Sequence, residues 1–266
     1  MISIYKWRLF YLILSSILLL TLAYFVIKER FSYDIFFLLT VFFLFLHFFF
    51  QRFEKKKTLK IHMIYLQDLN PLAYLEEYQK FNKKRFLSKA AKSINKINSA
   101  LVLLTADKIE KAHQILIGLV DQEPKFGPYL RFWYYTAWIN YYDEVDDLTR
   151  MKFLLEQNKA ILKEIPPKYR QKLVENFEFF KAKCFVKEGI FLDTAENYFY
   201  DILRTNLPKL TILNCVYQLG VIAYKNGKYE LSKRRFQSVV MNGKDLNEAK
   251  KAKTFLEKID ELNLNA

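Results

Sequence analysis

Residues 217–236 read YQLGVIAYKNGKYELSKRRF, and this stretch decides the fold of the soluble part of the chain. Its small, aromatic and turn-forming positions are Leu219, Gly220, Gly227, Tyr229, Ser232 and Phe236. Apolar and small residues recur every three or four positions in this stretch. This spacing is typical of two apolar helical segments with a glycine between them. The stretch predicts two antiparallel helices that turn at Gly227 and approach each other closely at small residues.

The same spacing recurs upstream. One unit earlier, the offsets are filled by Gly189, Phe191, Thr194 and Tyr198. A still earlier unit fills them with Asp107, Ile109, Ala112 and Leu116. Residues 127–163 keep the pattern only approximately, and turn residues fall at Gly127-Pro128, Pro166-Pro167 and Pro208. A period of about 30–40 residues is typical of stacked helical hairpins, which bury a continuous core that no single hairpin has.

The 217–236 stretch resembles a tetratricopeptide repeat, in which a Leu-Gly pair lies in the first helix and small and aromatic residues lie in the second. Ala112 and Pro124 match the small and terminal-proline positions of that family, and the resemblance extends over about residues 94–262. The chain departs from the family at Lys244, where proline is usual, and at Asp107, where glycine is usual. The resemblance implies an α-solenoid.

The last segment, residues 245–262, has the composition of a capping helix. Its predicted inward positions are Leu246, Ala249, Ala252, Phe255 and Ile259. The remaining residues are mostly Lys, Glu and Asn, and a polar outer face is what the end of a repeat stack requires.

Two apolar segments precede the repeats. Residues 9–27 and 35–50 contain no charged residue, and about 20 apolar residues cross a bilayer as a helix. We predict a transmembrane hairpin in residues 1–50, with spans at about 9–27 and 33–50. A cleaved signal peptide is the alternative for the first segment, but residues 24–27 read YFVI, which is no small-residue cleavage site.

Basic residues flank the second span and set the predicted orientation. Those that follow it are Arg52, Lys55, Lys56, Lys57 and Lys60, whereas the linker between the spans has only Lys28 and Arg30. The positive-inside rule then places both termini and the repeats in the cytoplasm of a cell-membrane protein. The same basic residues are expected to attract anionic lipids, although they also read as a plain topology signal on a solvated helix.

The domain organisation follows from these segments. The fold class is all-α: a two-span transmembrane hairpin (1–50), basic juxtamembrane helices (51–93) and a tetratricopeptide-like solenoid with a capping helix (94–266). In the second part, Asn70 followed by Pro71 predicts a helix start.

Catalytic and cofactor motifs are not found. The three histidines lie far apart at His47, His62 and His113, and Cys184 and Cys215 have no ligand-like spacing. The acidic residues at 143, 144, 146 and 147 are read as a helix–helix turn in which Asp146 or Asp147 caps the next helix. We therefore predict no enzyme, no metal and no cofactor.

Binding residues are carried over from the family resemblance, which implies a concave groove lined by the first helix of each pair. The implied lining residues are Arg131, Tyr134, Trp138, Tyr141, Asn176, Phe179, Lys183, Lys187, Asn214, Tyr217, Tyr224 and Lys225. Aromatic, amide and cationic side chains suit a peptide with acidic or C-terminal carboxylate groups. The aromatic residues could equally be core between repeats.

The leading functional hypothesis is a membrane-anchored cytoplasmic scaffold that binds a protein partner. Nucleic-acid binding is an alternative suggested by the net charge of +14, but the basic residues concentrate beside the membrane and no recognition module is present. An accessory subunit of a membrane enzyme or transporter is the other alternative.

Overall fold

The computed structural model describes residues 33–83 and 87–264, together with residues 13, 15–17, 19–21, 23–24 and 26–28. Within this part of the chain, every regular element is a helix. The chain divides into two compact units. One contains Met1–Met63 and Glu76–Leu87, and the other contains Ile64–Leu75 and Ser88–Ala266.

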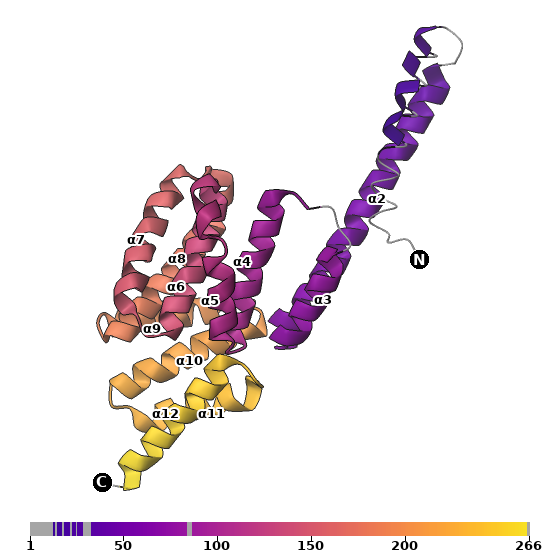
Figure 1. The fold of residues 1–266 in the computed structure, drawn as a ribbon. Helices are drawn as coiled ribbons and strands as arrows, with labels where there is room; N and C mark the ends of the chain where they lie inside the picture. Colours follow the sequence, from indigo (N-terminus) through magenta and orange to yellow (C-terminus); the bar gives the residue numbers. More distant parts are fainter. Residues whose placement is uncertain are drawn as a thin grey trace. The chain divides into compact units, whose positions relative to one another are not determined.

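Helix α2 (Tyr33–Leu66) runs without a break from the apolar segment into the basic one (Figure 1). Its part Phe37–Leu66 is long and apolar enough to cross a membrane. Among the described residues only this helix meets that test, whereas the sequence predicts two spans. The predicted span at about 9–27 is only partly described, so the two-span hairpin stays a prediction.

The basic residues of α2 are accessible. The side chains of Arg52, Lys55, Lys56, Lys57 and Lys60 are all exposed. A helix rises about 1.5 Å per residue, so this group begins directly at the end of the apolar segment and extends about 12 Å along the axis. Lys57 also lies 5.8 Å from the ring centre of Phe81 in the same unit.

Helix α3 (Pro71–Lys83) begins where the sequence predicts. The side chain of Asn70 accepts a hydrogen bond of 3.0 Å from the backbone N–H of Ala73. This capping contact satisfies one of the free N–H groups at the helix start.

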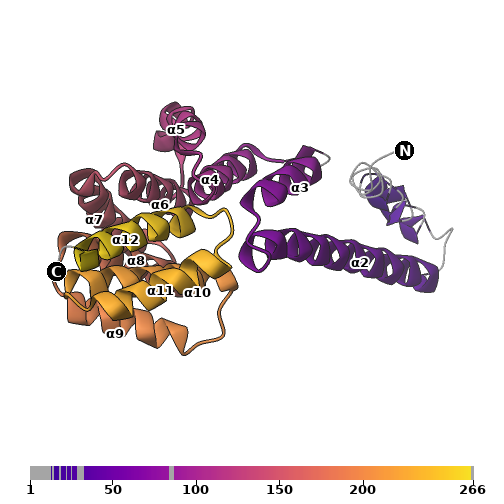
Figure 2. The same ribbon diagram turned by 90° about the horizontal axis from the view of Figure 1, so that it is seen from below.

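The second unit consists of helical hairpins followed by a last helix (Figure 2). The hairpins are α4 (Lys89–Thr105) with α5 (Ile109–Ile117), α6 (Pro128–Glu144) with α7 (Leu148–Glu164), α8 (Pro167–Glu188) with α9 (Leu192–Leu203), and α10 (Lys209–Lys225) with α11 (Tyr229–Asn242). A short 3-10 helix (Val120–Lys125) follows α5, and α12 (Asn247–Leu264) ends the unit. Each hairpin packs on the next, as in an α-solenoid, and the turns predicted at Gly127-Pro128, Pro166-Pro167 and Pro208 are confirmed.

A left-handed residue marks the turn of each hairpin. Asp107, Asp146, Gly189 and Gly227 have φ values of 57°, 61°, 77° and 70°. Glycine, aspartate and asparagine tolerate this conformation best. The structural repeat therefore has a period of about 40 residues, and residues 127–163 form a complete hairpin despite their divergent sequence.

The repeat phase predicted for α9 is wrong by one residue. Ala195 and Phe199 are fully buried there, whereas Thr194 is exposed and Tyr198 is only half-buried. The turns before α9 and α11 both contain three residues, but Gly189 is the first residue of its turn and Gly227 is the second. Two residues therefore follow the left-handed glycine before α9 and one follows it before α11, which shifts α9 by one position relative to the aligned pattern.

The inward positions predicted for residues 245–262 are confirmed. Leu246, Ala249, Ala252 and Ile259 are almost fully buried, and Phe255 is partly buried against the same core. Besides α11 and α10, helix α12 also contacts α4, the first helix of the unit. The inner helices α6, α8 and α10 therefore share a cavity with α12.

Candidate functional site

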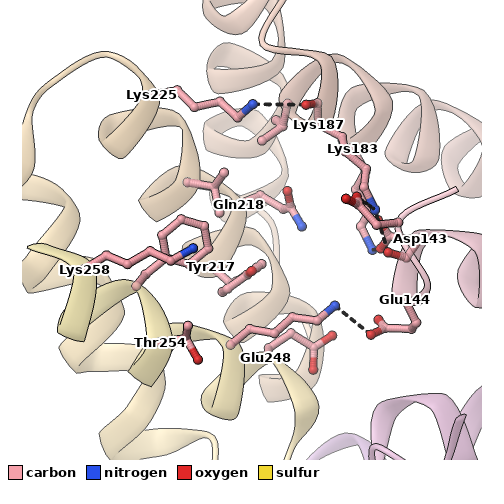
Figure 3. Close-up of a pocket in the computed structure, with 15 residues that line it drawn as sticks. Asp143, Glu144, Lys183, Lys187, Tyr217, Gln218, Lys225, Glu248, Thr254 and Lys258 are labelled. Atoms are coloured by element: carbon pink, nitrogen blue, oxygen red, sulfur yellow. Dashed lines mark hydrogen bonds and ion pairs between the residues drawn. The ribbon is translucent and has the colours of Figure 1, made fainter. Parts of the chain in front are cut away.

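A cavity of about 460 Å³ lies between the C-terminal ends of α6, α8 and α10 and one face of α12 (Figure 3). Its size is in the range of ligand pockets, about 300–1,000 Å³. The lining is rich in charge, with five lysines and four carboxylates. They are Lys183, Lys187, Lys225, Lys251, Lys258, Asp143, Glu144, Asp146 and Glu248.

Asp143 is the centre of the first ionic group in the lining. Its carboxylate lies 2.5 Å from the ammonium nitrogen of Lys183 and 3.2 Å from that of Lys187. Burial alone would raise the pKa of Asp143, but Lys183, Lys187 and Lys251 outweigh it and hold that pKa well below its usual range. Burial would likewise lower the pKa of Lys183, and Asp143 raises it instead. Lys187 also pairs with the exposed Asp146 at 3.0 Å.

Glu144 is the centre of the second group and connects α6 to α12. Its carboxylate lies 2.6 Å from the ammonium nitrogen of Lys251 and accepts a hydrogen bond from the side chain of Asn247. The side chain of Glu144 is only 10% exposed. Buried charges of this kind require partners, since an unpaired charge in a protein interior is costly.

Glu248, in the first turn of α12, differs from the other carboxylates. Its Oε2 atom is buried and has no hydrogen-bond partner in the described structure. Burial and the nearby Glu144 raise the pKa of this carboxyl group. The uncharged form of Glu248 is therefore favoured compared with an exposed glutamate.

Two lysines in the lining have no carboxylate partner among the described residues, and one amide there has no hydrogen-bond partner. Lys225 donates only to the backbone carbonyl of Lys187, at 3.0 Å, and Lys258 contacts only the ring of Phe255, at 5.5 Å. Gln218 is 8% exposed, and no protein group in the described part hydrogen-bonds with its amide. In Figure 3 this amide points into the cavity. The cavity therefore offers unused positive charge and an unused amide.

Four of the residues predicted to line a groove meet at this cavity: Lys183, Lys187, Tyr217 and Lys225. Lys183 and Lys187 already form ion pairs with Asp143 in the structure without a ligand. Their role in this state is structural. The carboxylates of Asp143, Glu144 and Glu248 share the lining with these four residues.

The predicted residues of α6 lie elsewhere. Tyr134 is buried and donates to the carbonyl of Leu116, while Tyr141 stacks on His113 at 4.6 Å. Trp138 packs edge-on against His113, and Arg131 pairs with Glu123 at 3.1 Å. These four side chains face α5 and the 3-10 helix. The aromatic residues among them therefore match the alternative given above, in which they are core between repeats.

The remaining predicted residues do not line the cavity. Phe179 packs edge-on against Phe199, and Tyr224 packs edge-on against Phe255. Asn176 and Asn214 are half-buried on the inner helices α8 and α10. Whether any of them contacts a partner stays a prediction.

Sequence reasoning missed Gln218, Glu248, Lys251 and Lys258 and assigned Asp143 and Glu144 to a turn. Of the two predicted capping residues, Asp147 caps α7. Its side chain accepts a hydrogen bond of 2.9 Å from the backbone N–H of Arg150. A usable signal was the spacing of Gln218, Val221 and Lys225, which share one face of a helix.

Metal and thiol chemistry find no support at this site. No group of three or more potential ligands that could hold a metal is found in the described part of the chain. Burial raises the pKa of both Cys184 and Cys215 to about 12, so neither thiol is activated.

Comparison with models of known families, with curated proteins and with solved structures finds no match to this chain. The function of the site is therefore argued from the residues of this chain alone.

Proposed function

We propose that this chain is a membrane-anchored scaffold whose helical repeats hold an acidic or C-terminal carboxylate segment of a partner protein in the α6–α8–α10–α12 cavity. The observation that carries the proposal is the pair of ammonium groups of Lys225 and Lys258, which line the cavity without a carboxylate partner. The acids of the lining do not compensate them, because Asp143 and Glu144 are bound to other lysines.

The apolar and aromatic parts of the lining support a peptide rather than a bare ion. Tyr217, Val221 and Phe255 lie beside the two lysines. Peptide sites combine such anchors with a few placed polar groups. The tetratricopeptide-like pattern of residues 217–236 agrees with this function, since helical repeat proteins present inner surfaces to partners.

The membrane part of the proposal rests on α2. A helix that is apolar over Phe37–Phe50 and strongly basic over the next ten residues is typical of a span with its basic end at the cytoplasmic leaflet. The five exposed basic residues of α2 would each gain about 1 kcal/mol against anionic lipids. In this arrangement the repeats are held in the cytoplasm close to the membrane.

A capture experiment with matched variants tests the proposal. The full-length chain in lipid nanodiscs would be used to capture proteins from lysate of its source cells, beside Lys225→Glu/Lys258→Glu. The control is Lys228→Glu/Lys253→Glu, which changes two exposed lysines outside the lining. We expect one acidic-tailed protein to be lost with the first variant and retained with the control. Equal capture by all three proteins would contradict the proposal.

Reversal of Lys183 or Lys187 is unsuitable for this test. Each contacts the buried Asp143, so a glutamate at either position would create repulsion inside the protein. Loss of binding would then report loss of the fold.

A further inference from the structure

Gln218 lines the cavity and is 8% exposed, and no protein group in the described part of the chain hydrogen-bonds with its amide. Oδ1 of Asn158 and Oε2 of Glu248 are fully buried without a hydrogen-bond partner, whereas the polar atoms of Gln218 are not among such atoms. The amide of Gln218 is therefore accessible from the cavity and free to hydrogen-bond with a ligand there.

The position of Gln218 links it to the unpaired lysines. It lies on α10 at seven residues, about two turns, before Lys225. Lys258 reaches the same cavity from α12 (Figure 3). A ligand whose carboxylate lies at these lysines would bring its neighbouring atoms toward the amide.

The chemistry of a carboxamide defines what it can recognise. Gln218 offers two N–H donors and one carbonyl acceptor. A carboxylate alone would use only the donors, and an ammonium ion would use only the acceptor. A peptide group provides one acceptor and one donor in a planar array, so it can use both functions of the amide at once.

Charge in the surroundings favours a neutral group at this position. A ligand cation would approach Lys183, Lys187 and Lys225, and a second ligand anion would approach Asp143 and Glu144. Like charges at short range are unfavourable. A peptide group avoids both penalties.

We propose that Gln218 binds a backbone peptide group adjacent to the ligand's carboxylate, which makes it the residue that distinguishes an extended peptide from a simple organic acid. The inference rests on the proposed function, because it assumes that the carboxylate is held at Lys225 and Lys258. It adds the class of occupant: a chain segment bound through its main chain.

Three small probes separate these contacts. N-acetylglycine has one peptide group and one carboxylate, acetoxyacetate replaces the peptide N–H by an ester oxygen, and N-acetylglycinamide lacks the carboxylate. Their dissociation constants for the full-length chain in nanodiscs would be measured by ligand-observed NMR. The same measurements would be made with Gln218→Leu and with Gln237→Leu, a control on α11 that is exposed and outside the lining.

We expect N-acetylglycine to bind roughly two- to tenfold more tightly than acetoxyacetate, the range that one net hydrogen bond gives. Gln218→Leu should reduce this ratio to about one, while Gln237→Leu should preserve it. Melting temperatures would establish that both variants are folded.

The outcomes separate the two proposals. If both acids bind equally to the unchanged protein, or if their ratio persists in Gln218→Leu, the role of Gln218 is wrong while the carboxylate site stands. If neither acid binds, or if N-acetylglycinamide binds as well as N-acetylglycine, the carboxylate site is wrong and the inference fails with it.

Discussion

The α-carbon of Gly220 faces the ring of Phe236 so closely that a Cβ atom at Gly220 would lie 2.7 Å from Cε1 of that ring. In the same hairpin, the hydroxyl of Ser232 donates a hydrogen bond of 2.9 Å to the carbonyl of Gly220. Phe236 is fully buried and stacks on Phe255 of α12 at 4.8 Å. The small residues of α10 and α11 thus allow the close approach that also positions α12 against the cavity.

Gly220→Ala should destabilise the second unit because its methyl group cannot fit without moving the ring of Phe236. Overpacking of this kind costs about 1–3 kcal/mol in the free energy of unfolding. Gly127→Ala is the matched control, since a Cβ there meets nothing within 4 Å. Chemical denaturation of both variants checks the prediction, and equal midpoints would contradict it.

The local contacts of this hairpin could be predicted from the sequence because they depend on helical spacing. Gly220, Ser232 and Phe236 all lie within one pair of helices, and α12 has the inward residues that its pattern predicts. The phase of α9 could not be predicted, since it depends on where the left-handed Gly189 lies within a turn that also contains the left-handed Phe191.

The cavity could not be predicted from the sequence, for a different reason. Asp143 pairs with Lys183 on α8, and Glu144 pairs with Lys251 on α12. These partners are far apart in the chain and meet only because the stack brings α12 back toward α4 and α6. No periodic pattern in a single helix contains that information, so an acidic cluster resembles an ordinary solvated turn.

Removal of the basic group of α2 should disturb the proposed orientation. Replacing Arg52, Lys55, Lys56, Lys57 and Lys60 with Gln removes the positive charge that favours the cytoplasmic side. We expect a smaller fraction of chains with a cytoplasmic C-terminus, measured by protease protection of a C-terminal tag. Five exposed lysines of the second unit serve as the control when changed to Gln: Lys163, Lys168, Lys172, Lys228 and Lys253. An unchanged fraction in the α2 variant would refute the orientation argument.

Asp143→Asn should strongly destabilise the second unit. The change leaves the buried ammonium group of Lys183 without its counter-ion, and loss of one partner of a buried pair costs about 3–5 kcal/mol. Asp146→Asn is the control, because the side chain of Asp146 is 87% exposed and exposed ion pairs contribute about 0–1 kcal/mol. The difference between the two variants in urea denaturation measures the contribution of burial.

The loss of unfolding free energy in Asp143→Asn should depend on pH, and its direction follows from the pKa of Asp143. Because the folded-state pKa of Asp143 is below the ordinary value of 3.8, its stabilisation is present above that value and is lost as the pH falls through and below it. The gap in unfolding free energy between the unchanged protein and Asp143→Asn should therefore narrow between about pH 5 and pH 2. A gap that stays constant over this range would show that the ion pair is not its source.

Glu248→Gln should have the opposite pH dependence. The folded-state pKa of Glu248 is above the ordinary value of 4.5, because of burial and Glu144, so the stability that its uncharged form contributes is present at low pH and is lost as the pH rises through the folded-state pKa. Glutamine resembles the uncharged acid and does not ionise. We expect the stability of Glu248→Gln relative to the unchanged protein to increase from about pH 4 to pH 7, as measured by urea denaturation at each pH.

Lys183 and Lys251 reduce this effect without reversing it, since both face Glu248 but are already bound to Asp143 and Glu144. Glu257→Gln, an exposed change on the same helix, is the control and should follow the unchanged protein at every pH. If Glu248→Gln also runs parallel to the unchanged protein, Glu248 is ionised and compensated in the fold. The cavity would then have a lower net positive charge than the carboxylate site requires, so this measurement tests the charge balance at Lys225 and Lys258 without any ligand.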